Sequence, residues 1–136
     1  MSSISTIALS GMKAAARRLD VSASNVANVM STGALPNADG TVPAGAPRAY
    51  APLELVQTAS AGGGTQTTVT TATPSTTAVF DPQAPFANQN GLVAAPNVDL
   101  SQEMVGQMIA SYSFAANATV MKADDRMTST LLNITA

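Results

Sequence analysis

Each end of the chain carries a long stripe of apolar residues at helical spacing, and these two stripes constrain the possible folds more than any other feature. Steps of three and four residues run through residues 9–30 and again through residues 105–134. The members are Leu9, Met12, Ala16, Leu19, Ala23, Val26 and Met30, followed by Val105, Ile109, Tyr112, Ala116, Val120, Ala123, Met127, Leu131 and Ile134. Because an α-helix turns once in about 3.6 residues, these steps place each stripe on one helical face. The sequence therefore predicts two long amphipathic helices.

Local signals set the expected limits of these helices. The first is expected over residues 4–30, with a stop near Gly33, a residue type that often follows a helix end. The second is expected over residues 98–134, where Asp99 and Gln102 form a candidate capping box.

The middle of the chain has a different composition. All eight prolines lie within residues 34–97. Residues 50–58 and 66–73 flank the glycines at 62–64 and are predicted to be two short strands of a hairpin set in long loops. Residues 80–97 are expected to form an ordered strap, poor in regular structure, that leads the chain back to the second helix.

The predicted fold is mainly α: two long terminal helices that pair as a coiled-coil-like hairpin, with a small, β-prone, loop-rich insertion. Its expected parts are the N-terminal helix (1–33), a variable insertion (34–79), the strap (80–97) and the C-terminal helix (98–136). Charged residues make up 10% of the chain and tryptophan is absent. A thin core and a weakly charged surface favour a protein that is stabilised by association, helix against helix and then against neighbouring copies.

The chain lacks the residues that several classes of protein function require. The chain contains no cysteine and no histidine, which excludes thiolate nucleophiles, Ser-His-Asp triads and the usual nitrogen or sulfur ligands of metals. No acid–base pair supports the alternative of a carboxylate-based hydrolase, so we expect no enzyme, cofactor or metal. The adjacent Asp124 and Asp125 are expected on a solvated helix face rather than at a metal ion. Six basic residues do not make a nucleic-acid surface, and no apolar run is long enough to span a membrane.

Short motifs near both ends resemble those of flagellar rod and hook proteins. The matching stretches are SGMKA (10–14), RLDVSASNVAN (18–28), FDP (80–82), GLV (91–93), PNVD (96–99), EMV (103–105) and SYSFAAN (111–117). The stretches from residue 80 onward are similar to those of proximal-rod proteins of the FlgC type. Two departures stand out: VMSTGALP at 29–36 replaces the turn usual in the family, and residues 34–79 hardly resemble it.

The resemblance implies a structural subunit of the proximal rod, the drive shaft of the bacterial flagellum, with the two helices paired in an inner domain. It also implies export to the periplasmic rod by the flagellar type III apparatus without a cleaved signal peptide. The implied partners are other rod proteins, further copies of the chain, the switch/export ring and hook–basal-body adaptor proteins. The alternative is an export-gate adaptor, or a subunit of a divergent rod or hook system.

Thirteen residues are predicted to form the helix-packing and assembly interface. They are Met12, Leu19, Asn25, Val26, Asn28, Val105, Ile109, Tyr112, Phe114, Ala116, Asn117, Met127 and Leu131. Asn25 and Asn28 are expected to hydrogen-bond between helices or subunits, as buried asparagines do when they fix register. Tyr112 and Phe114 are candidates either for anchors of a subunit contact or for ordinary core residues.

Overall fold

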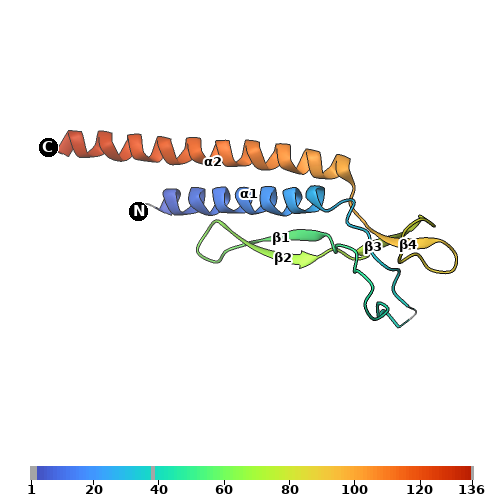
Figure 1. The fold of residues 1–136 in the computed structure, drawn as a ribbon. Helices are drawn as coiled ribbons and strands as arrows, with labels where there is room; N and C mark the ends of the chain where they lie inside the picture. The colour runs from blue at the N-terminus through green and yellow to red at the C-terminus, as the bar shows by residue number, and fades with distance from the viewer. Residues whose placement is uncertain (1–2, 38, 136) are drawn as a thin grey trace. The chain divides into compact units, whose positions relative to one another are not determined.

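In the computed structural model, which describes residues 3–37 and 39–135, a helix near each end of the sequence flanks a small β-rich middle in chain order (Figure 1). The elements in chain order are α1 (Ser3–Ala27), β1 (Leu53–Ala59), β2 (Thr65–Thr71), β3 (Thr76–Phe80), β4 (Leu92–Pro96) and α2 (Leu100–Thr135). The predicted class, terminal helices around a β-prone insertion, is confirmed. Neither helix is long and apolar enough over the described residues to cross a membrane.

Side chains cap both helices near their predicted limits. The Oδ1 atom of Asp99 accepts the backbone N–H groups of Ser101 (2.8 Å) and Gln102 (3.1 Å), so Asp99 caps the N-terminus of α2 as predicted. The helix α1 ends at Ala27, earlier than the predicted Met30. Serine and asparagine are weak helix formers, and the Nδ2 atom of Asn28 donates to a carbonyl of the last turn, at Ser24 (2.9 Å).

The strands β1 and β2 form the predicted hairpin around the glycine run. Ser60 and Gly64 close its turn, with a hydrogen bond of 3.1 Å from the N–H of Ser60 to the carbonyl of Gly64. Gly63 and Gly64 have φ angles of 87° and 82°, a region that other residues enter only with strain. The glycine run therefore supplies the reversal between the two strands.

The strands β3 and β4 form a second hairpin, which the sequence did not predict. They pair antiparallel from Thr76 opposite Pro96 to Phe80 opposite Leu92. On its other side, β4 exchanges two hydrogen bonds of 2.9 Å between Gly33 and Ala94. The segment 80–97 is thus partly regular, because β4 is buried between these two neighbours.

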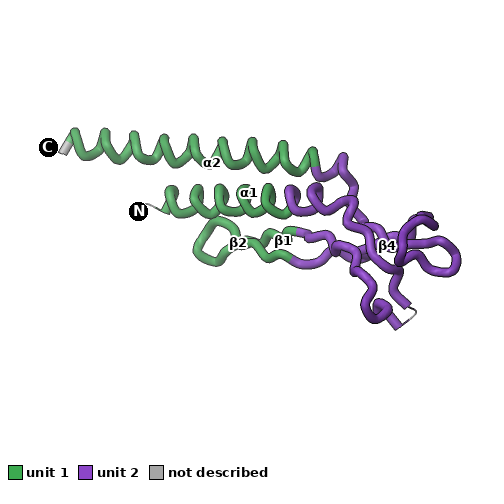
Figure 2. Tube along the Cα trace, viewed as in Figure 1, with its two compact units in different colours: residues 1–21, 55–69, 104–136 green, residues 22–54, 70–103 purple. Residues whose placement is uncertain are grey.

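By its internal contacts the chain divides into two compact units (Figure 2). Unit 1 comprises residues 1–21, 55–69 and 104–136; unit 2 comprises residues 22–54 and 70–103. In unit 1, α1 lies between the antiparallel α2 and the β1–β2 hairpin (Figure 1). Unit 2 holds the β3–β4 hairpin, the end of α1 and the first turn of α2.

Little large apolar surface is buried in either unit. Val93 is the one large side chain with less than 2% exposure among the described residues. The other buried apolar residues are small: Ala8, Ala14, Ala15, Ala34, Ala94 and Ala110, with Pro52 and Pro96. The thin core expected from the composition is confirmed.

Candidate assembly surface

In unit 1, the side of α2 that faces α1 is built mainly from small and polar residues. Ala110 is 1% exposed, and Ser113 and Asn117 are half-buried on the same side. Bulky side chains would hold the helix axes apart, whereas alanine and serine allow a close approach. The contact between α1 and α2 is therefore close but poor in apolar surface.

Gly11 and Asn117 form the closest point of this contact. A Cβ atom added to Gly11 would lie 2.5 Å from the Oδ1 atom of Asn117, which is inside van der Waals distance. The Nδ2 atom of Asn117 donates to the carbonyl of Ser113 (2.8 Å), which holds the side chain in place. Glycine weakens a helix, so its presence inside α1 is explained by this approach.

Asp124 corrects one prediction, because it is 6% exposed and not part of a solvated face. It accepts a hydrogen bond from the hydroxyl of Ser5 on α1. Its position seven residues after Asn117 puts it on the same helical side, toward α1. The neighbouring Asp125 is exposed as expected. Among the described residues no group of three or more acids could hold a metal ion.

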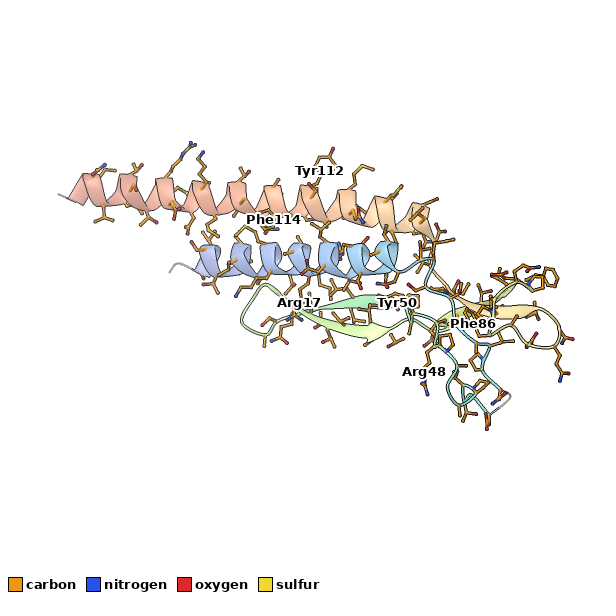
Figure 3. All side chains as sticks on the ribbon, viewed as in Figure 1. Arg17, Arg48, Tyr50, Phe86, Tyr112 and Phe114 are labelled. Atoms are coloured by element: carbon orange, nitrogen blue, oxygen red, sulfur yellow. The ribbon has the colours of Figure 1, made fainter. Side chains whose placement is uncertain are left out.

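The predicted apolar stripe of α2 lies about a quarter of a turn around the helix from its α1-facing side, and it is exposed. Tyr112 is 73% exposed and points away from α1 (Figure 3). The other large members behave alike: Val105, Ile109, Val120, Met127, Leu131 and Ile134 are all exposed, as is Ala116. Coiled-coil-like pairing through the two stripes within one chain is therefore not confirmed. A periodic pattern identifies a face that needs a partner but does not identify the partner.

Phe114 lies apart from this stripe, on the side of α2 toward α1 (Figure 3). With Leu19 and Ala16 of α1 it lines a mostly apolar groove of about 270 Å³. Phe114 and Leu19 are 46% and 44% exposed, so the groove leaves apolar surface uncovered. The remaining predicted residues of α1, Met12 and Val26, are half-buried.

In unit 2, Asn25 is the centre of a buried hydrogen-bond network. It is 2% exposed and its side chain makes four hydrogen bonds. The Nδ2 atom donates to the carbonyl of Leu53 (2.9 Å) and to the Oε1 atom of Glu103 (2.6 Å). The Oδ1 atom accepts the N–H of Leu53 (2.9 Å) and the hydroxyl of Tyr50 (3.0 Å). The side-chain amide thus makes all four of the hydrogen bonds that it can make. These bonds join α1 to β1 and to the first turn of α2.

Further polar contacts surround this network. The hydroxyl of Ser22, 3% exposed, donates to the carbonyl of Glu103 (3.1 Å), and Ser24 shares a hydrogen bond of 3.0 Å with Tyr50. The sequence analysis missed Ser22, Tyr50 and Glu103, since each acts through residues distant in the chain. Asn28, by contrast, bonds within its own turn and at the exposed Ser31.

Comparison with known proteins adds a consistent set of matches. Residues 6–34 match the family model "Flagella basal body rod protein", and residues 89–134 match "Flagellar basal body rod FlgEFG protein C-terminal". The flagellar basal-body rod protein FlgC of Salmonella typhimurium is 36% identical over 115 residues, covering 85% of this chain and 83% of that protein. FlgC of Buchnera aphidicola is 31% identical over 131 residues, covering 96% and 95%. The flagellar hook protein FlgE of Escherichia coli is 40% identical over 45 residues, 33% of this chain and 11% of that protein.

Proposed function

The chain belongs to the flagellar basal-body rod protein family and is a structural rod subunit, and we propose that it builds the proximal rod by packing the exposed face of α2 against neighbouring subunits. Relatives named FlgC and both family models support the family and the structural role. The proximal position and the packing mode are our proposal. The alternative of an export-gate adaptor is not favoured.

One observation carries the proposal: most large apolar residues of α2 are exposed, while its α1-facing side holds mainly small and polar residues, with Phe114 as a large exception. Ile109 is 49% exposed and Tyr112 is 73% exposed, whereas Ala110 is 1% exposed. Exposed apolar faces of this extent mark sites of protein association. Burial of apolar surface contributes roughly 25 cal/mol per Å², so neighbours that cover this face would stabilise the subunit substantially.

The contact between copies would be heterologous, with the α2 face of one subunit on a different surface of the next. Contacts of this kind generate a helical assembly when the rotation does not close. Coiled-coil-like pairing, which the single chain does not need for its own α1–α2 contact, would then occur between subunits. Interlocked helices resist deformation, as a shaft that transmits torque requires.

Location and partners follow from the same proposal. Family membership supports a place in the flagellar basal body, in assembly with its other components. We place the subunit in the periplasmic part of the rod and infer export through the flagellar type III apparatus without a cleaved signal peptide. The proposed neighbours are other rod proteins, further copies, the switch/export ring and hook–basal-body adaptor proteins.

Electron microscopy of basal bodies, with swimming scored in parallel, tests this function. A strain that lacks the gene should yield rings without a complete rod, and the wild-type gene should restore rods and motility. Ile109→Asp and Leu19→Asp should fail to restore them, because a buried unpaired charge prevents close packing. Ser129→Asp, an exposed position of α2 off the stripe, should restore both. Normal rods with Ile109→Asp would refute the packing mode, and normal rods without the gene would refute the proximal role.

A further inference from the structure

A second surface of unit 1 lies on the other side of α1, where the helix meets the β1–β2 hairpin. A groove of about 520 Å³ opens between them. Ser10 of α1 fixes one end of the hairpin, because its hydroxyl oxygen accepts the N–H of Thr65 (3.1 Å). The groove is thus bounded by a helix and a strand that are tied together.

The charges that line this groove are all positive. Lys13 and Arg17 are its only charged lining residues; the others are hydroxyl, amide, glycine or apolar residues. Within the described residues, neither Lys13 nor Arg17 has an ion-pair partner. Arg17 extends from α1 on the side of the hairpin (Figure 3). Two cations beside neutral polar groups attract an anionic ligand.

The strand side of the groove indicates the shape of that ligand. Four consecutive residues of β2, Thr65 to Thr68, line the groove. Successive side chains of a strand point to opposite faces, so an opening that touches all four borders the edge of the strand. The N–H of Thr65 is taken by Ser10, but beyond it β2 pairs only with β1 in the described part of the chain, so the edge from Gln66 onward is available for a further strand.

We propose that this groove binds an extended acidic segment of a different basal-body protein, which adds to β2 as a third strand and places two acidic side chains on Lys13 and Arg17. Backbone pairing supplies affinity in such strand additions, and alternate side chains supply specificity. Lys13 and Arg17 are four residues apart on a helix, so their Cβ atoms are about 6 Å apart. Residues two apart on a strand are separated by about 6.6 Å. The spacing therefore selects two acids with one residue between them.

The sequence explains why the partner is a different protein. The eight acidic residues of this chain include no two that are separated by a single residue. A second copy therefore cannot supply the required pattern. The inference rests on the proposed function only in that the chain works among other basal-body proteins; it does not depend on the α2 face.

Peptide binding to the purified full-length chain tests the inference. The probe is a fluorescein-labelled peptide of alternating threonine and valine that carries two aspartates separated by one residue, and binding is followed by fluorescence anisotropy. A matched peptide has the same composition with the aspartates adjacent, so that they point to opposite faces. We expect the first peptide to bind roughly tenfold more tightly, and its affinity to fall as salt rises. N-methylation of its backbone should abolish binding, since a third strand needs the N–H groups.

Variants of the chain separate this site from general electrostatics. Lys13→Gln with Arg17→Gln should weaken binding of the first peptide by about tenfold, and the charge-preserving exchange Lys13→Arg with Arg17→Lys should retain it. Lys122→Gln with Arg126→Gln removes two cations from α2 and should leave binding unchanged. Equal affinity for the two peptides, no binding of either, or unchanged affinity in the Lys13→Gln, Arg17→Gln variant would overturn the proposal. Because the isolated chain is measured, such a failure leaves the rod function untouched, and Ile109→Asp should bind the peptide normally.

Discussion

The two sides of α2 differ in a way that reverses the usual arrangement of a helix in a small soluble protein. The side toward α1 in unit 1 carries Ala110, Ser113 and Asn117, while Ile109 and Tyr112 lie on an adjacent, exposed side of the helix. A soluble amphipathic helix normally buries its large apolar residues within its own chain. Here small and polar groups make the contact within one chain, and the large apolar groups are left exposed. The difference is the basis of our proposal that α2 packs against neighbouring subunits.

The contacts within the chain contribute specificity more than bulk stability. A typical hydrogen bond adds only about 1 kcal/mol net, but an unpaired buried partner costs about 1–3 kcal/mol. Asn25, with four hydrogen bonds, and Asp124, bonded to Ser5, therefore penalise any other alignment of the elements that they join. Such polar contacts set a register within the chain, and in the proposed assembly they would give the exposed apolar face a defined orientation.

Loss of the Asn25 side chain should have the largest effect on the isolated chain. Asn25→Ala removes the side chain that pairs with both backbone groups of Leu53 and with Glu103, and should lower the free energy of unfolding by about 3 kcal/mol. Urea unfolding followed by circular dichroism measures this change. The control Asn28→Ala removes bonds within one turn and should cost less than about 1 kcal/mol. Equal losses would show that the buried network carries no special role.

Substitutions of the adjacent Asp124 and Asp125 should give the next largest effect and should differ from each other, because only Asp124 is buried. Asp124→Ala removes the acceptor of the Ser5 hydrogen bond from a buried position and should cost about 2 kcal/mol. Asp125→Ala, at an exposed position, should change the free energy of unfolding by less than about 0.5 kcal/mol. The same urea experiment checks both. If Asp125 mattered as much as Asp124, the description of an inner and an outer side would be wrong here.

Gly11 offers a test in which the sign of the effect changes. Gly11→Ala should destabilise the chain by about 1 kcal/mol, because its Cβ would collide with Asn117 and this outweighs the better helix propensity of alanine. In the Asn117→Ala background, the same substitution should stabilise the chain by about 0.5–1 kcal/mol. Gly106→Ala is the matched control, since a Cβ there meets no atom within 4 Å, and it should stabilise the wild type. A stabilising Gly11→Ala in the wild type would contradict the close contact.

A substitution in the exposed stripe of α2 should have the smallest effect on the stability of the isolated chain. Tyr112→Ser removes a side chain that is 73% exposed, so the free energy of unfolding should change by less than about 0.5 kcal/mol. Basal bodies isolated from cells that carry this variant should nevertheless contain fewer complete rods. A large loss of stability without loss of assembly would mean that Tyr112 belongs to the interior of the single chain.

The sequence predicted elements better than it predicted contacts. Helical spacing located both helices, and the glycine run located the β1–β2 hairpin, because these signals are local. The same spacing could not tell whether the stripe through Ile109 meets the chain itself or a neighbour. Asp124 was misplaced because the charged Lys122 and Arg126 beside it suggested a solvated face. The strand β4 was not predicted, because its segment, Leu92–Pro96, is buried by partners from distant parts of the chain.

Site-specific photo-crosslinking at positions 112 and 113 in intact basal bodies tests the central claim most directly. These neighbouring residues of α2 point in different directions, about 100° apart, since Tyr112 is exposed and Ser113 is half-buried on the side of α1. A photoreactive side chain in place of Tyr112 should join the subunit to a second protein and raise its mass on a denaturing gel. The same group in place of Ser113 should react within its own chain and leave the mass unchanged. Intermolecular products from position 113 and none from position 112 would contradict an α2 helix that turns its apolar face to its neighbours.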